Sequence, residues 1–170
     1  MKSRLIKNDE PIPAAAVAFV RDAAREIEVY LSRRPAHFRY YPGAFVFPGG
    51  RRDLEDTDLR ATARREVKEE IGVDIDTSLL VPLRDIHTSP HAGPIYRMLT
   101  FAYPIDFEFV TTLNPEEVDE EVWVPAGVAL ERFDLPYQIR AAVFTISRFP
   151  RVAALIAALD SGSINEDYLF

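Results

Sequence analysis

Three glutamates close together near the end of one predicted helix are the residues of this chain best suited to chemistry. Glu66, Glu69 and Glu70 stand in the segment REVKEEIGV. At about 100° per helical residue, Glu69 and Glu70 lie about 60° and 40° to either side of Glu66, so all three carboxylates project from one face. Like charges at this spacing repel each other, and acids in the last turn oppose the helix dipole. A divalent cation bound by the carboxylates would reverse both penalties, so the pattern indicates a metal site.

A solvated, charged helix face is the alternative interpretation of the same residues. Arg65 and Glu69 stand four residues apart, and Arg64 and Lys68 add further positive charge, so basic residues can neutralise the acids without a metal. The neighbouring sequence favours the metal site. The glycine pair at 49–50 permits a tight turn in which a backbone carbonyl approaches a metal closely.

The helix that carries the glutamates has clear predicted boundaries. Asp58 is a favourable N-cap and Gly72 a favourable left-handed stop, which predicts a helix from Leu59 to Ile71. An apolar stripe overlaps the edge of the acidic face, so we expect the carboxylates to lie at the boundary of the core; it consists of Leu59, Ala63, Val67 and Ile71.

The remaining elements alternate between strands and helices. An apolar strand at 14–20, expected to be central in a sheet, forms a hairpin with a strand at 27–32, and a short strand at 44–47 brings the glycine pair to the site. Further strands are predicted at 79–86, 96–103 and 121–124, and helices at 127–132, 137–147 and 152–159, with breaks at Pro136 and Pro150. This order predicts an α/β fold with a mixed sheet.

Composition restricts the class of protein. At 170 residues and 48% hydrophobic content, we expect a polar N-terminal arm at 1–13 and one domain at 14–170. A net charge of −7 argues against a general nucleic-acid or membrane-surface binder. The absence of cysteine excludes disulfides, thiol catalysis and thiolate-bound zinc. Without a signal-peptide core or a run of about 18 apolar residues, we expect a cytoplasmic protein. The oligomeric state stays open, a homodimer included.

A basic, aromatic stretch precedes the acidic helix. From Glu28 to Asp53 there is no acidic residue, although the chain as a whole is acidic. Arginine forks suit phosphate oxygens, and aromatic rings can stack on a base. The alternative is an exposed strand end whose arginines pair with surface acids. The residues concerned are Arg33, Arg34, Arg39, Arg51 and Arg52, with Phe38, Tyr40 and Tyr41.

The segment from Phe47 to Val73 resembles the signature of the Nudix hydrolases, G-x5-E-x7-R-E-U-x-E-E-x-G-U, in which U is aliphatic. Residues 65–73 fit its second half without a mismatch. In the first half, Asp56 stands where the family has glutamate, and the spacing from there to Arg65 is one residue longer. The resemblance implies an α/β/α sandwich with a mixed sheet.

The resemblance also implies roles for individual residues. Glu66, Glu69 and Glu70, with the carbonyl of Gly49, would hold Mg2+ or Mn2+. Glu66 or Glu69 would act as general base on the attacking water, and Arg65 would orient Glu69 across one turn. In several members of the family a later loop supplies the base, so the acids of NPEEVDEE are further candidates, unless they form a solvated loop; they are Glu116, Glu117 and Glu120.

Residues 30–50 are similar to the signature of the coenzyme A pyrophosphatase branch, L-L-T-x-R-[SA]-x3-R-x3-G-x3-F-P-G-G. The spacing is the same, with substitutions at Tyr30, Ser32 and Pro35. This similarity implies hydrolysis of coenzyme A or acyl-coenzyme A to 3′,5′-ADP and (acyl-)4′-phosphopantetheine. The 3′-phosphate would be bound by Arg34, Arg39 or Arg51.

Two other functions stay open. The first is a Nudix pyrophosphatase acting on ADP-ribose, NADH or a diadenosine polyphosphate. The second is a non-catalytic nucleotide-binding module with a Nudix fold, which is disfavoured because Glu66, Glu69 and Glu70 are all present. In each case the expected partner is a small nucleotide. The choice among substrates, the preferred metal, the identity of the base and the role of the C-terminal helices are not decided by the sequence.

Overall fold

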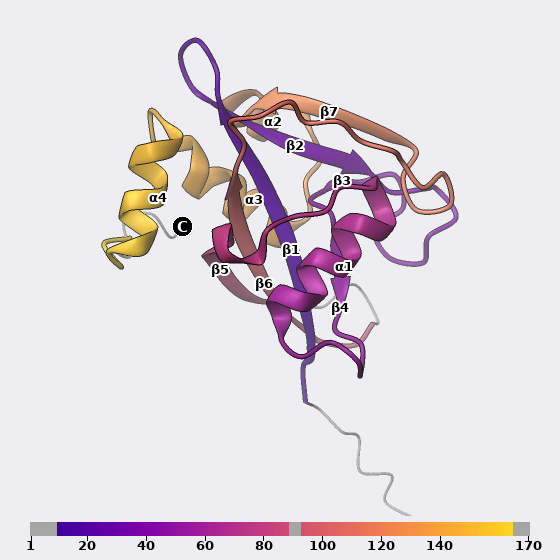
Figure 1. Ribbon diagram of the computed structural model, residues 1–170. Coiled ribbons are helices and arrows are strands. Elements are labelled where there is room, and N and C mark those ends of the chain that lie inside the picture. Colours follow the sequence, from indigo (N-terminus) through magenta and orange to yellow (C-terminus); the bar gives the residue numbers. More distant parts are fainter. Residues whose placement is uncertain (1–9, 89–92, 165–170) are drawn as a thin grey trace, which may run out of the picture.

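Strand β1 (Ile12–Asp22) is the central element of a seven-stranded mixed sheet (Figure 1). The computed structural model describes residues 10–88 and 93–164. The strand order is β3-β2-β1-β6-β5, with β4 paired to β1 and β7 paired to β2. β1 is parallel to β6 and antiparallel to β2 and β4. The other strands are β2 (Ile27–Arg33), β3 (Phe45–Val46), β4 (Gly49–Arg51), β5 (Val81–Thr88), β6 (Tyr96–Pro104) and β7 (Glu120–Pro125).

The side chains of β1 alternate between two apolar cores, one on each face of the sheet. Ala15, Val17 and Phe19 pack on the face covered by α1 (Leu59–Ile71). Their neighbours Ala16, Ala18 and Val20 pack on the face covered by the C-terminal helices. Burial on both faces explains why β1 is apolar throughout. The predicted α/β/α sandwich is confirmed; its C-terminal layer consists of α2 (Ala126–Arg132), α3 (Tyr137–Ser147) and α4 (Val152–Asp160).

The helix of the acidic motif has the predicted boundaries. The Asp58 side chain accepts a hydrogen bond of 2.9 Å from the backbone N–H of Ala61. Gly72 ends the helix in the left-handed region with φ 72°, and its N–H bonds the Lys68 carbonyl. Capping chemistry therefore sets both ends of α1.

Several element boundaries differ from the sequence prediction. The expected strand at 79–86 begins only at Val81, because residues 77–79 form a short 3-10 turn capped by Asp76. The short strand expected at 44–47 is present as Phe45–Val46 of β3, and the glycine pair that follows begins a further strand, β4. β1 begins at Ile12, inside the arm expected at 1–13, of which residues 1–9 lie outside the described part of the chain.

The two halves of β1 pair with different partners along one edge. Near its end, Val20 pairs with Val29 of β2. Near its start, Ala16 pairs with Gly49 of β4, and between the two Val17 donates to the Pro48 carbonyl at 2.9 Å. β2 and β4 thus pair with different parts of the same edge of β1. This arrangement places the glycine pair beside Ala15 and Ala16 and next to α1.

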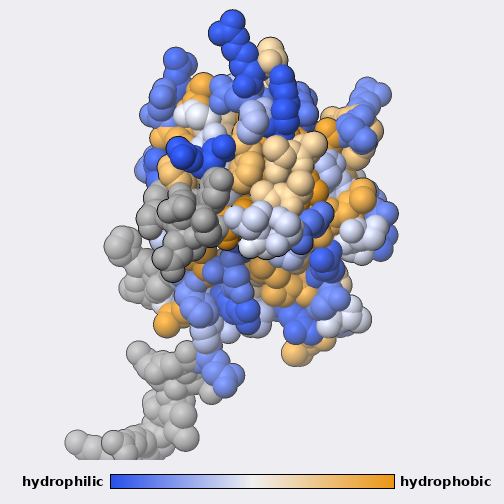
Figure 2. Space-filling view, turned by 90° about the vertical axis from the view of Figure 1, so that its left-hand side faces the viewer, coloured by the Kyte–Doolittle hydropathy of each residue, from blue (hydrophilic) through white to orange (hydrophobic). Residues whose placement is uncertain are grey.

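The C-terminal helices complete the second layer. α3 buries most of its length against the sheet, whereas α4 fully buries only Leu155. Figure 2 shows polar and apolar residues interspersed on the side of the molecule where α4 lies. Across residues 10–88 and 93–164, no single helix is long and apolar enough to cross a bilayer; α3 and α4 together would suffice by length and composition, but they are bent by 108°.

Candidate active site

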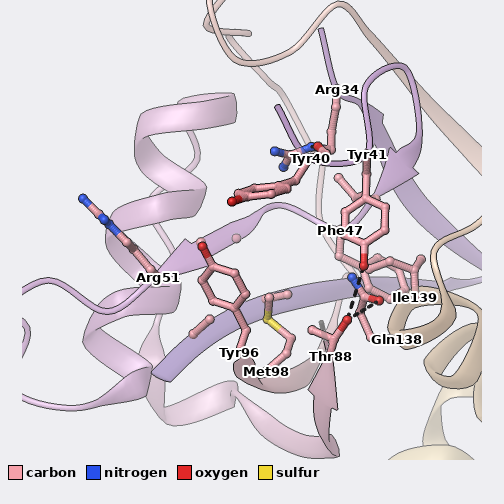
Figure 3. A pocket seen from close by; sticks show the side chains of 15 residues that line it. Arg34, Tyr40, Tyr41, Phe47, Arg51, Thr88, Tyr96, Met98, Gln138 and Ile139 are labelled. Atoms are coloured by element: carbon pink, nitrogen blue, oxygen red, sulfur yellow. Dashed lines mark hydrogen bonds between the residues drawn. The ribbon is translucent and has the colours of Figure 1, made fainter. Parts of the chain in front are cut away.

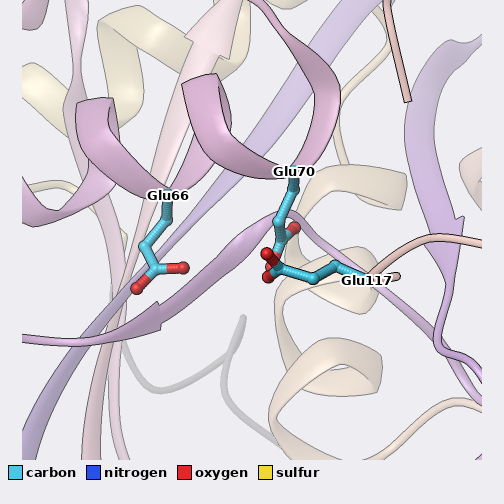
Figure 4. Close-up of side chains that lie close together, drawn as sticks. All are labelled: Glu66, Glu70 and Glu117. Atoms are coloured by element: carbon cyan, nitrogen blue, oxygen red, sulfur yellow. The ribbon is translucent and has the colours of Figure 1, made fainter. Parts of the chain in front are cut away.

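Three buried or half-buried carboxylates from two segments face one another (Figure 4). Glu66 and Glu70 project from successive turns of α1 and are only 9% and 8% exposed. Glu117 reaches them from the loop before β7. One oxygen of each carboxylate lies within 4.8 Å of the others. We call these three residues the acidic cluster.

Burial and mutual repulsion make the acidic cluster unfavourable when its members are charged. Burial raises the pKa of Glu70 well above its usual range, and the charges of Glu66 and Glu117 raise it further. Burial also raises the pKa of Glu66, although Arg65 opposes this effect. Three carboxylate oxygens in one half-buried space are the ligand chemistry that Mg2+ and Mn2+ prefer. The donor set therefore fits the divalent metal that the sequence predicts.

The glycine pair allows the backbone to approach the acidic cluster. A Cβ atom at Gly50 would lie 2.5 Å from Oε1 of Glu66, and one at Gly49 would lie 2.2 Å from the Ala15 carbonyl oxygen. At Gly49 the backbone of β1 leaves no room for a side chain, and at Gly50 a side chain would push the Glu66 carboxylate out of its place. The N–H of Gly49 donates to Oε2 of Glu70 at 3.3 Å. These close approaches explain why glycine stands at both positions.

A loop docked onto the end of α1 delivers Glu117. The backbone N–H of Asn114 donates to the Glu70 carbonyl at 2.8 Å, and that of Thr112 donates to the Ile71 carbonyl at 2.8 Å. The Asn114 side-chain amide donates to Oε1 of Glu117 at 2.9 Å. The sequence made Glu117 one of three candidate acids in this loop, but it contained no pattern that distinguished Glu117 from Glu116. Of the other two acids considered there, Glu116 is exposed, and Glu120 is exposed and forms an ion pair of 3.2 Å with Arg33.

Glu69 does not join the acidic cluster. Its side chain is 50% exposed and pairs with Arg65 at 3.1 Å, while the same Arg65 nitrogen also lies 2.9 Å from Oε1 of Glu66. Glu69 stood at the edge of the predicted acidic face, and the helix turns that edge toward solvent. The predicted contact between Arg65 and Glu69 is therefore present, but the third carboxylate beside Glu66 and Glu70 is Glu117.

Asp56 explains the irregular first half of the motif. It is buried and accepts two hydrogen bonds from Arg65, of 3.1 and 2.9 Å. The Thr62 hydroxyl and the Asp53 N–H each donate to it at 2.9 Å. Chiefly through the Arg65 hydrogen bond, the pKa of Asp56 falls to about 2. Asp56, which is shorter than the glutamate of the family signature, thus holds Arg65, and Arg65 in turn contacts Glu66.

We expect Asp56→Ala to lower the free energy of unfolding by about 1 to 3 kcal/mol, because it leaves the partly buried Arg65 without its main partner. Urea unfolding monitored by circular dichroism measures the change. Asp53→Ala is the matched control, since that carboxylate is 53% exposed and lies 3.8 Å from Arg65; its effect should stay within about 0.5 kcal/mol. Equal effects of both substitutions would contradict the anchoring role of Asp56.

A cavity of about 220 Å³ opens beside the glycine pair (Figure 3). Arg34 and Arg51 line it, whereas Arg39 is exposed outside it, with its guanidinium 5.3 Å from the centre of the Tyr40 ring. The other residues that line it come from β1, the segment before β4, β5, β6 and α3, and include Tyr40, Tyr41, Val46, Phe47, Thr88, Tyr96, Met98, Gln138 and Ile139.

Arg34 connects the cavity with the acidic cluster. Its Nε donates to the Tyr40 carbonyl at 3.0 Å, and its guanidinium lies 4.5 Å from the centre of the Phe38 ring. Burial lowers its pKa, while the nearby charges of Glu70 and Glu117 raise it. Arg34 is thus a cation held near the acidic cluster and at the cavity, and its guanidinium suits phosphate oxygens.

Comparisons with known proteins agree with this arrangement. A curated relative, the "Uncharacterized Nudix hydrolase NudL" of Yersinia pestis, is 32% identical over 108 residues, which are 62% of this chain and 51% of that protein. The chain spans about half the length of the curated relatives it matches. A NUDIX hydrolase structure from Alicyclobacillus acidocaldarius superposes with a TM-score of 0.76 at 22% identity, covering 88% of this chain and 97% of that one. The NUDIX domain of Shewanella oneidensis NrtR, solved with ADP ribose, gives 0.65 at 16% identity, with coverage of 79% and 84%.

The NUDIX domain model matches residues 11–143. This range runs from the start of β1 into α3 and contains the acidic cluster, the glycine pair and the residues that line the cavity. The chain therefore belongs to the Nudix family.

Proposed function

We propose that this protein is a metal-dependent diphosphatase that hydrolyses a nucleoside diphosphate linked to another moiety. The observation that carries the proposal is the position of the acidic cluster, whose carboxylate oxygens lie within 4.8 Å of one another, next to a cavity that shares the glycine pair and contains Arg34 and Arg51. A cation-binding group and a phosphate-binding group thus adjoin one open space.

The proposed roles follow from contacts and burial. Mg2+ or Mn2+, when bound, would neutralise the diphosphate and favour attack of water on phosphorus. Glu66, Glu70 and Glu117, with the Gly49 carbonyl, are the proposed ligands. Glu69 lies at the exposed rim, where it can receive a proton from water, so it stays a candidate base beside Glu66 and Glu117. The arginine between Glu66 and Glu69 holds both carboxylates in place.

Coenzyme A or an acyl-coenzyme A is the substrate we place first. The support is the sequence similarity of residues 30–50 to the coenzyme A pyrophosphatase branch, together with two cavity arginines in different settings. Arg34 is near the acidic cluster and suits the diphosphate. Arg51 is exposed at the cavity and suits an additional 3′-phosphate. ADP-ribose is the second candidate, because a structural relative was solved with that compound; NADH and diadenosine polyphosphates belong to the same test.

A panel of diphosphates, incubated with Mg2+ or Mn2+ and analysed by product mass, tests the proposal. We expect coenzyme A to be cleaved with a kcat/KM about tenfold or more above that of dephospho-coenzyme A. Arg51→Ala should remove most of this difference, because a charged hydrogen bond is worth about 1.5 to 3 kcal/mol. Arg39→Ala is the matched control and should preserve it.

Each outcome of the panel has a distinct meaning. Equal turnover of the two coenzymes, or preferred turnover of ADP-ribose, would overturn the coenzyme A assignment but keep the diphosphatase. Cleavage of no nucleoside diphosphate derivative, with nucleotide binding retained, would instead favour the non-catalytic binding module.

A further inference from the structure

Gln138 of α3 is a buried amide at the cavity wall, far along the chain from the Nudix motif. The residue is 6% exposed, and its Oε1 accepts a hydrogen bond of 3.2 Å from the Thr88 hydroxyl. That hydroxyl also lies 3.4 Å from the hydroxyl of Tyr41 (Figure 3). Within residues 10–88 and 93–164, the Gln138 amide nitrogen donates no hydrogen bond. Gln138 lines the cavity, and its amide nitrogen is not among the fully enclosed polar atoms, so it is accessible and free to donate to a ligand there.

The cavity has different chemistry at its two ends. Figure 3 shows Gln138, Thr88 and Tyr41 together at one end and Arg51 at the other. Tyr96 and Met98 lie between them and line the cavity with an aromatic ring and a thioether. A flat heterocycle fits such walls through stacking and sulfur contacts. Its polar edge would then meet the amide, while its phosphates extend toward the arginines.

We propose that Gln138 recognises the base of the nucleotide substrate and selects adenine over guanine. This inference rests on the proposed function and names the base that the site accepts. Adenine presents a ring-nitrogen acceptor next to an amino donor, which pair with the amide nitrogen and Oε1 of a glutamine. Guanine presents O6 in place of the amino group, so Oε1 would face another acceptor. Thr88 keeps the amide in this orientation by donating to Oε1.

Equilibrium binding of adenosine and guanosine 5′-monophosphates, measured by calorimetry without metal, tests base selection apart from catalysis. Wild-type protein should bind the adenine nucleotide about 10-fold to 100-fold more tightly. Gln138→Glu presents only acceptors, which repel the ring-nitrogen acceptor of adenine but can accept from the N1–H and the 2-amino group of guanine. That variant should weaken adenine binding about tenfold or more and reverse or abolish the preference. The ratio of kcat/KM for adenosine and guanosine diphosphate-linked substrates should change in the same direction.

Thr88→Val is the second variant, because it removes the hydroxyl that orients the amide while nearly preserving shape. It should reduce the preference for adenine by a few-fold, and it gives a result even if Gln138→Glu does not fold. Equal wild-type affinity for both nucleotides, or an equal loss for both in Gln138→Glu and in Thr88→Val, would overturn the inference. Selective adenine binding without cleavage of any diphosphate would support the inference and contradict the proposed function.

Discussion

Glu70→Gln is expected to lower kcat with Mg2+ by about 1,000-fold or more. Glu70 is the most enclosed member of the acidic cluster, with Glu66 and Glu117 as neighbours and the Gly49 N–H as donor. The amide keeps the size of the side chain but removes the charge that binds the cation. Because the metal supplies much of the charge stabilisation in such a reaction, losing a ligand costs several kcal/mol of activation free energy. Steady-state kinetics at saturating substrate, with metal titrated to saturation, measure the effect.

Glu69→Gln is the matched control on the same helix. Glu69 is adjacent in sequence but half exposed, and its carboxylate pairs with Arg65. We expect a loss of about 30-fold or less, together with a small change in metal affinity. A loss equal to that of Glu70→Gln with unchanged metal affinity would identify Glu69 as the general base. The same loss with weakened metal affinity would show that Glu69 also binds the metal and that the acidic cluster as observed is incomplete. Full activity in Glu70→Gln would rule out the proposed metal ligands altogether.

Local chemistry made the helix and the central strands predictable. Asp58 and Gly72 satisfy the two ends of α1, so its limits follow from capping alone. β1 is buried on both faces, and an apolar run without alternation is typical of such a central strand. The resemblance to the Nudix signature, which joins the glycine pair to the acidic helix, then predicted the α/β/α sandwich around these elements.

The site was less predictable where residues meet across long separations. Glu117 joins Glu66 only because Asn114 docks a loop on the end of α1, and a sequence pattern contains no such contact. Helical spacing placed Glu69 near the edge of the acidic face, but spacing alone could not show whether that edge points to the core or to solvent. No sequence pattern indicated a role for Gln138, because a single glutamine in an apolar helix can be assigned to a site only once the cavity beside it is known.

The free energy of unfolding of the metal-free protein is expected to fall as the pH rises from about 5 through the raised pKa of Glu70. A carboxyl whose folded pKa lies above its unfolded value binds its proton more tightly in the folded state, so its stabilising contribution is complete at low pH and lost above the folded pKa. At pH 8, Glu70→Gln should therefore be more stable than the metal-free wild type, by about 1 to 3 kcal/mol. Thermal unfolding in a chelator, recorded for both proteins from pH 5 to 8, measures the difference.

Bound metal should reverse the order of stability of wild type and Glu70→Gln. Mg2+ or Mn2+ at 100 times its Kd stabilises a binding protein by about 2.7 kcal/mol, so wild type at pH 8 should gain several degrees in Tm while Glu70→Gln gains almost none. At pH 5 the gain should shrink, because protons compete with the cation for Glu66 and Glu70. A carboxylate cluster that served only the fold would behave in the opposite way, since Glu70→Gln would then destabilise the metal-free protein and leave the metal response unchanged. In a metal site the charged Glu70 therefore destabilises the metal-free protein and stabilises it once metal binds, whereas an acid that serves only the fold would stabilise the metal-free protein.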